Sequence, residues 1–334
     1  MDTLKSTSIR RSLLTNLVAI VLLLGVTIFG MTFLGGRGAV QRFSQSLIDQ
    51  ASARTEQELQ RFFDPVSRQL RILQELGESG RLDLDDPELL NAMVTAFMAQ
   101  HPWVTSVMVA DGTGREHMLL REDGRWRNRQ VGGPAAGDRA VWWEWTEDAA
   151  GRTVEEETLD YDPRERPWYV GAVEGRQGAG QPWLYWTEPY TFFTTQDPGI
   201  TASTALETPD GDLRVVGLDV LLTDISRFTT RIDVHGQGFA FVLSDDGRLI
   251  GIPRRESILS DDTLRELLLK RPEDLDTPLA RDAATALLGP ELDSGATRFT
   301  SQGEAWWGEV RPFALGNGRT LHMGVAVPEK DLLP

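Results

Sequence analysis

The chain has 334 residues, of which 40% are hydrophobic and 25% charged, so it is an ordinary folded protein with room for two domains. It contains no cysteine, which excludes thiol catalysis, thiolate metal sites and disulfides. Its formal net charge of −16 argues against sequence-independent nucleic-acid binding, because that binding depends on lysine and arginine neutralising phosphates.

An uncharged apolar segment near the N-terminus predicts a membrane anchor. Residues 13–34 carry no charge, and about 20 such residues span a hydrocarbon core. Arg10 and Arg11 precede this transmembrane segment, so residues 1–12 are expected to be a cytoplasmic tip and the bulk of the chain to be periplasmic. A cleaved signal peptide is the alternative, although its apolar region is usually only about 7–15 residues long.

Helical periodicity follows from Ala39 to Leu76, where apolar residues recur at steps of three and four. This pattern predicts a long amphipathic helix. It could simply pack on a domain, or it could also continue the membrane helix as a stalk that carries motion and dimer contacts. Asp64-Pro65 is expected to kink or break the helix near its middle.

A second helix is predicted in DDPELLNAMVTAFMAQ, residues 85–100, where an aspartate caps the chain before Pro87. The pattern then changes to apolar runs separated by turns such as Asp-Gly, which are typical of antiparallel hairpins. Strands, two of them within 239–253, are predicted at 103–110, 115–120, 141–148, 183–190, 200–207, 213–222, 239–253, 296–301, 305–313 and 320–328.

Two further helices are expected, one at 223–232 opened by Thr223 and one in the region 260–289. Hairpins with segregated helices indicate an α+β architecture. The strand–turn–strand openings at Asp111-Gly112 and Asp246-Gly247 hint at two related lobes.

The segment YDPRERPWYVGA, residues 161–172, concentrates aromatic and charged side chains in one turn-like stretch. Pro167 restricts Arg166 to extended conformations and suits the first position of a helix. Arg166 is therefore expected beside a helix N-terminus, where a guanidinium and unpaired N–H groups both favour an anion such as a carboxylate. Trp168 and Tyr169 would supply rigid walls. The alternative is a packed corner between a strand and a helix.

Asp219 lies within the apolar strand VVGLDVLL, where strand alternation predicts burial. A buried carboxylate needs a partner. A ligand ammonium is one candidate, and aromatic faces would add to its attraction. A backbone group or a protein arginine is the other candidate. Tyr190, in TEPY, carries no information by itself.

Taken together, YDPRERPWYVGA, WTEPY, VVGLDVLLTDISRF and GFAFVLSDDGRLIGIP resemble the double Cache extracytoplasmic sensor domain of bacterial transmembrane receptors. The resemblance covers nearly everything from Gly35 to the end of the chain. It implies an α+β fold with an N-terminal transmembrane helix, a long stalk helix and two tandem PAS-like (Cache) lobes with antiparallel sheets. The implied division is residues 35–100 for the stalk and N-terminal helices, 101–235 for a membrane-distal, ligand-binding lobe and 236–334 for a membrane-proximal lobe.

Many family members that bind amino acids share a pattern of Tyr, Arg, Trp-Tyr and Ala, followed by a later Tyr and a later Asp. The matching residues here are Tyr161, Arg166, Trp168, Tyr169, Ala172, Tyr190 and Asp219. By resemblance, Arg166 and Trp168 hold a ligand carboxylate. Tyr169, Tyr190 and Asp219 then surround its amine. The segment TFFTTQDPGITAS, after TEPY, is longer than the usual connection to the next strand. It resembles the corresponding segment of Cache sensors attached to nucleotide cyclases and phosphatases more than that of chemotaxis receptors. The identity of the ligand, and whether the pocket binds a ligand amine, therefore stay open.

Catalytic and metal-binding patterns were not found in the sequence. The four histidines lack metal spacing, and neither a Gly-x-Ser-x-Gly elbow nor a phosphate loop occurs. We therefore expect neither an enzyme within these residues nor a cofactor.

Two hypotheses remain for the function. The first is the sensor portion of a receptor that binds an amino acid, an amine or a small carboxylate, forms a homodimer through its stalk helix and signals to an output domain outside this sequence. The second is a membrane-anchored protein-interaction module with a vestigial pocket. Internal pairing of Arg166 with Asp219 would favour the second.

Overall fold

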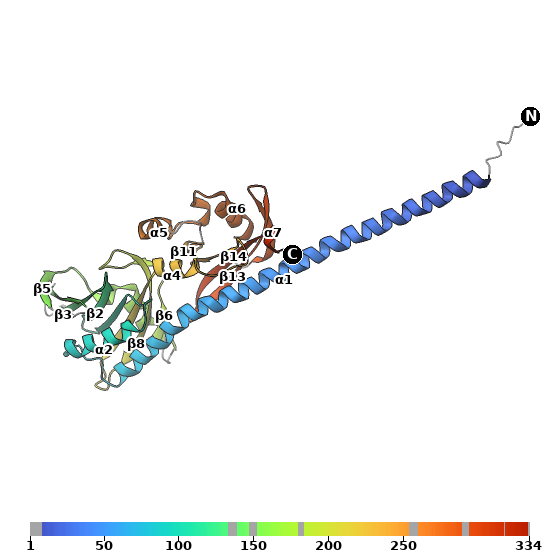
Figure 1. Ribbon diagram of the computed structural model, residues 1–334. Coiled ribbons are helices and arrows are strands. Elements are labelled where there is room, and N and C mark those ends of the chain that lie inside the picture. Colours follow the sequence, from blue (N-terminus) through green and yellow to red (C-terminus); the bar gives the residue numbers. More distant parts are fainter. Residues whose placement is uncertain are drawn as a thin grey trace, which may run out of the picture.

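One long helix, α1 (Ile9–Glu78), organises the molecule, and two antiparallel sheets lie along its C-terminal half (Figure 1). The computed structural model describes residues 9–132, 139–146, 152–179, 184–253, 260–288, 294–316 and 318–332. Within α1, the segment Leu13–Met31 is long and apolar enough to cross a membrane, and almost all of its residues are exposed. Figure 1 shows this segment pointing away from both sheets.

A kink or a break was predicted at Pro65, and the break is wrong, because α1 continues through this residue. Proline removes one backbone hydrogen bond from a helix interior. Phe62, Phe63 and Val66, on the adjoining turn, are almost completely buried between the two sheets. Their packing keeps the backbone helical where local propensity alone would disfavour it.

The first lobe is built on a nine-stranded sheet. Its strands are β1 (Ser106–Asp111), β2 (Arg115–Glu122), β3 (Arg125–Gly132), β4 (Arg139–Thr146), β5 (Thr153–Thr158), β6 (Tyr185–Trp186), β7 (Tyr190–Thr191), β8 (Pro198–Glu207) and β9 (Leu213–Leu221). They run in the order β5-β4-β3-β2-β1-β9-β8-β6, and β7 also pairs with β8. Strands β3 and β5 were not predicted from the sequence, because β3 consists mostly of polar residues and every residue of β5 is exposed.

The two faces of this sheet carry different helices. Helix α2 (Pro87–Ala99), whose N-terminus is capped by Asp86 as predicted, packs with α1 on the face that presents Val107 and Val109. Helix α3 (Pro167–Ala179) packs on the opposite face, with Met108 and Ala110. Successive β1 side chains thus alternate between an apolar core and the face that carries the candidate site.

The second lobe is built on a five-stranded sheet of order β11-β10-β14-β13-β12. Its strands are β10 (Phe239–Leu243), β11 (Leu249–Gly251), β12 (Ser294–Ser301), β13 (Glu304–Gly316) and β14 (Arg319–Pro328). Helix α4 (Leu222–Thr229) joins the lobes, and α5 (Asp261–Leu267), α6 (Pro278–Leu287) and α7 (Glu329–Leu332) belong to the second. The predicted helix within 260–289 is therefore two helices, separated by a 3-10 turn at Pro272–Asp274.

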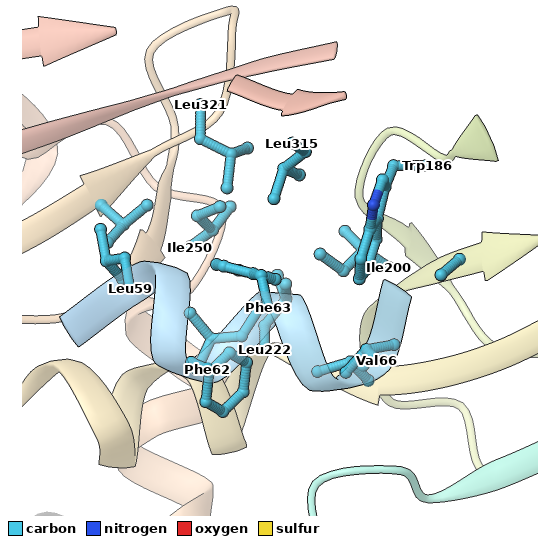
Figure 2. Close-up of a cluster of buried hydrophobic side chains, with 14 of the residues drawn as sticks. Leu59, Phe62, Phe63, Val66, Trp186, Ile200, Leu222, Ile250, Leu315 and Leu321 are labelled. Atoms are coloured by element: carbon cyan, nitrogen blue, oxygen red, sulfur yellow. The ribbon is translucent and has the colours of Figure 1, made fainter. Parts of the chain in front are cut away.

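A shared apolar cluster joins α1 to both lobes, as Figure 2 shows. Its labelled members are Leu59, Phe62, Phe63, Val66, Trp186, Ile200, Leu222, Ile250, Leu315 and Leu321. The ring of Phe63 packs edge-on against Trp186 of the first lobe, with centroids 5.6 Å apart, and lies 5.8 Å from Phe313 of the second. Both lobes therefore contact the same turn of α1, so a movement of either lobe would act directly on that turn.

Candidate functional site

A cavity of about 320 Å³ lies on the α3 face of the first sheet and extends to α5 of the second lobe. Strands β1, β2, β3 and β9 form its floor, and the loop after β7 forms one wall. Five of the six predicted site residues line it: Tyr161, Arg166, Trp168, Tyr190 and Asp219. Residues that are 58 positions apart in the sequence, Tyr161 and Asp219, are thus brought to one pocket by the fold.

Arg166 has the extended backbone that Pro167 was expected to impose, with φ −82° and ψ 144°. Its guanidinium carbon lies 5.7 Å from the ring centroid of Tyr190 and 5.8 Å from that of Phe193. Its one hydrogen bond is a long one, 3.4 Å to the carbonyl oxygen of Thr191. Among the described residues it has no carboxylate partner, so most of its five N–H donors remain available to an anion.

Asp219 occupies the middle of β9 and is almost completely buried. Its carboxylate accepts hydrogen bonds from the hydroxyls of Ser106 and Thr201, both at 2.5 Å. Burial raises the pKa of Asp219 to about 6, although these two hydrogen bonds act in the opposite direction. No cation pairs with it in the part of the chain that the structure describes. Pairing with a protein arginine, one of the candidates from the sequence, is therefore not observed.

Tyr190 lies between these two charges. Its hydroxyl is 2.7 Å from Thr201 Oγ1, which also donates to Asp219. Its ring is close to the guanidinium of Arg166, and burial raises its pKa, so the phenol stays neutral. Tyr190 thus contacts the Arg166 guanidinium through its ring and the Asp219 carboxylate through the hydroxyl of Thr201.

Trp168 forms an almost completely buried wall of the pocket. Its indole packs against the sheet at Gly217, where an added Cβ would lie 3.1 Å from Trp168 Cε3. The carbonyl oxygen of Trp168 accepts a 2.7 Å hydrogen bond from Ser203. The absence of a side chain at Gly217 therefore lets the first turn of α3 approach the sheet closely.

Tyr169 does not line the pocket, contrary to the role that the resemblance implied. Its hydroxyl donates to the carbonyl oxygen of Asp111, and its ring packs edge-on against Trp168. Adjacent residues of a helix point about 100° apart, so only one of this pair can face the cavity. The structure places Trp168 there.

A buried ion pair between Arg129 of β3, which lines the pocket, and Glu116 of β2 was not predicted from the sequence. Arg129 Nη2 lies 2.6 Å from Glu116 Oε2, and the two side chains are 2% and 0% exposed. Tyr161 donates to the other oxygen of Glu116 at 2.6 Å, and Arg129 stacks 4.0 Å from the Tyr161 ring centroid. Tyr161 is therefore anchored by this pair. The sequence could have indicated this ion pair only if β3 had been predicted as a strand beside β2.

The unusual segment after TEPY forms a loop over the pocket. Phe193 packs on the Tyr161 ring with centroids 4.8 Å apart, and Thr194 Oγ1 accepts a hydrogen bond from Arg129 at 2.8 Å. At the end of this loop, Asp197 accepts from Arg265 of α5 at 2.6 Å. The loop thus touches both the pocket wall and the second lobe.

The chain was compared with known proteins, and no family model matches it. Methyl-accepting chemotaxis protein PctB of Pseudomonas aeruginosa is 33% identical over 100 residues, which is 30% of this chain and 15% of that protein. Adenylate cyclase 1 of Rhizobium meliloti is 26% identical over 269 residues, which is 73% of this chain and 38% of that protein. The chain therefore spans well under two thirds of the length of these relatives.

Solved structures match over a much larger share of the chain. The ligand-binding domain of the Pseudomonas fluorescens chemoreceptor CtaA, in complex with L-isoleucine, covers 89% of this chain with 97% of its own length, at a TM-score of 0.55 and 18% identity. The chain therefore has the fold of the ligand-binding domains of bacterial chemoreceptors, the double Cache fold that the sequence resemblance predicted.

Proposed function

We propose that this chain is the sensor portion of a bacterial transmembrane signalling receptor and that its pocket binds an α-amino acid. The observation that carries the proposal is one cavity that holds a guanidinium and a buried carboxylate, neither of which has an oppositely charged partner among the described side chains. Arg166 would bind the ligand carboxylate, Asp219 and Tyr190 would bind its ammonium, and Trp168 would form the wall beside them.

The alternative, a protein-interaction module with a vestigial pocket, predicted that Arg166 pairs with Asp219. Instead, Asp219 is bonded to two hydroxyls, and Arg166 makes one long bond to a carbonyl. Two buried or half-buried charges that are kept apart are costly unless something else pairs with them. This arrangement supports ligand binding over a vestigial pocket.

The rest of the receptor follows as part of the same proposal. The apolar segment of α1 would cross the membrane, with the N-terminus in the cytoplasm and both lobes in the periplasm. The first lobe would then be membrane-distal, because α1 carries it farthest from that segment (Figure 1). We further propose that α1 forms the contact of a homodimer and that ligand binding acts through it on an output domain, for which the match to an adenylate cyclase makes a nucleotide cyclase one candidate.

Isothermal titration calorimetry of the full chain in detergent micelles would test the proposal. The titrants are L-alanine, L-leucine, the amine 3-methylbutylamine, which is leucine without its carboxylate, and the acid 4-methylpentanoic acid, which is leucine without its amine. We expect the amino acids to bind and the amine and the acid, each lacking one charge, to bind at least tenfold more weakly. Equal binding of amino acid and acid would refute the role of Asp219, and no binding of any titrant would refute the proposal.

The pH dependence of ligand affinity should report Asp219. Its carboxylate must be ionised to pair with an ammonium, and its pKa in the free protein is about 6. We therefore expect affinity to be constant above about pH 7 and to fall by up to about tenfold per pH unit below 6. The measurement is the same calorimetric titration at pH 5, 6, 7 and 8. Asp219→Asn should bind weakly at every pH, and a wild-type affinity that does not change across this range would contradict the assignment.

Asp219→Asn should also stabilise the ligand-free protein near neutral pH. A carboxyl whose folded-state pKa is raised binds its proton more tightly when folded, so its contribution to stability is lost as the pH rises from about 4 through about 6. Above pH 6 the folded protein holds an ionised carboxylate at a cost on the order of 3 kcal/mol, which the neutral amide avoids. Thermal unfolding at pH 7.5 would check this, and a variant less stable than the wild type would show that the bonds from Ser106 and Thr201 outweigh burial.

The ion pair between Asp197 and Arg265 should slow ligand exchange, because it holds the loop over the pocket against α5. We expect Arg265→Ala to speed ligand dissociation several-fold, measured by stopped-flow tryptophan fluorescence. The pair is partly exposed, so stability should change by less than about 1 kcal/mol. Arg125→Ala, which removes an exposed pair with Glu144 outside the pocket, is the matched control. Equal dissociation rates in all three proteins would contradict this role.

A further inference from the structure

The charged side chains that line the pocket, other than Arg166 and Asp219, are already engaged or lie at its rim. Arg129 pairs with Glu116, Arg265 with Asp197, Arg227 with Asp224 and Asp261, and Glu122 with Arg127. Arg121 donates to the carbonyl oxygens of Met98, Pro102 and Val104. Asp123 is exposed in the turn between β2 and β3. Once a ligand has used Arg166 and Asp219, the described part of the pocket wall therefore offers no buried, uncompensated charge.

This distribution decides what a ligand side chain can carry. A charged side chain would have to break one of the existing ion pairs or remain unpaired in a partly desolvated cavity. Both are unfavourable, because a charge removed from water without a partner loses its hydration and gains nothing in return. The described part of the pocket thus discriminates against charged side chains by the absence of a buried free counter-charge, and it needs no direct steric clash to do so.

Part of the surface that remains available is apolar, and the uncharged side chains of Thr105, Thr194, Thr195 and Thr223 lie beside it. Met108 of β1 and Met118 of β2 lie directly opposite each other in the sheet and are both buried in the pocket floor. Leu120, Trp168 and Phe192 extend this apolar surface. Methionine side chains are flexible and polarizable, so such a floor can adapt to apolar groups of different shapes.

Building on the proposed function, we infer that the ligand is an α-amino acid with an uncharged, apolar side chain, which packs on the floor formed by Met108 and Met118. Arg166, Asp219 and Tyr190 read the part that all amino acids share. The floor reads the side chain, and the paired charges around it exclude ligands such as lysine and glutamate.

The test compares amino acids that differ only at the end of the side chain, by calorimetric titration of the full chain in detergent micelles. L-Norleucine and L-lysine share a four-carbon chain, which ends in an ammonium only in lysine. L-Homoleucine has the branched shape of L-glutamate, with two methyl groups in place of the carboxylate oxygens. We expect norleucine to bind at least tenfold more tightly than lysine, and homoleucine at least tenfold more tightly than glutamate. Lysine or glutamate binding as tightly as its apolar partner would overturn the inference and leave the proposed function standing. Failure of all four, and of glycine and alanine, would overturn the proposed function and the inference with it.

A variant locates the side-chain contact. Met118→Ala should weaken norleucine binding by about fivefold to tenfold and leave glycine binding unchanged, because glycine has no side chain to contact the floor. Met93→Ala, on α2 and outside the pocket, is the matched control and should change neither. If Met118→Ala weakens glycine and norleucine equally, or neither, the side chain does not pack on this floor. The comparison of apolar with charged amino acids on the wild type still tests the inference if Met118→Ala fails to fold.

Discussion

Arg166→Ala is expected to weaken amino-acid binding by about 2–4 kcal/mol, which is roughly 30- to 700-fold in Kd. The guanidinium is the one pocket cation that has neither a carboxylate partner nor a set of carbonyl partners among the described residues. Its loss would leave the ligand carboxylate without a charge-assisted hydrogen bond in a partly desolvated site. Calorimetric titration with L-leucine and with L-norleucine would measure the change.

Two further substitutions make this result specific. Arg166→Lys keeps the charge but not the planar pair of donors, so it should recover only part of the affinity. Arg164→Ala is the matched control, since Arg164 lies two residues away, pairs with Asp162 and does not line the pocket. It should leave Kd within about twofold of the wild type. The free energy of unfolding of Arg166→Ala should differ from that of the wild type by less than about 1 kcal/mol, because the Arg166 side chain makes one long hydrogen bond with the described residues. An Arg166→Ala protein that folds and binds normally would remove the basis of the proposed site.

Glu116→Ala is expected to destabilise the protein by about 3–5 kcal/mol. The substitution leaves the guanidinium of Arg129 buried without its counter-charge and removes the acceptor of the Tyr161 hydroxyl. The free energy of unfolding, measured by urea denaturation, should show this loss. Because the pair anchors Tyr161 at the pocket wall, ligand affinity should fall as well.

The matched control and the double variant separate burial from charge. Glu144→Ala removes a carboxylate from β4, where Glu144 pairs with exposed Arg125. This substitution should lower the free energy of unfolding by less than about 1 kcal/mol. In the double variant Glu116→Met with Arg129→Met, both charges of this buried pair are removed, so much of the lost stability should return. A single variant as stable as Glu144→Ala would show that water reaches Arg129 and compensates the missing carboxylate.

Local sequence determined the elements whose signals lie within a few residues. Pro167 set the extended backbone of Arg166 and the start of α3, and Asp86 capped α2. Apolar alternation located the central strands and the last three strands, since burial on one or both faces leaves a periodic pattern. The same reasoning failed for β3, where buried Arg129 is tolerated only because Glu116 of another strand pairs with it.

Tertiary structure decided everything that depends on which distant groups meet. Local sequence could not tell whether Trp168 or Tyr169 would face the pocket, because the choice depends on how α3 sits on the sheet at Gly217. It could not predict that α1 stays helical at Pro65, where packing from both lobes overrides a local preference.

The separation of the two pocket charges is also a tertiary result. The sequence supplied Arg166 and Asp219 as an unmatched cation and an acid in an apolar strand, and either could have paired with the other. The fold instead satisfies Asp219 with the hydroxyls of Ser106 and Thr201, which β-sheet register places opposite it. The residue types and their local backbone were therefore readable from the chain, but the open space between the charges exists only because the sheet and helix α3 hold them apart.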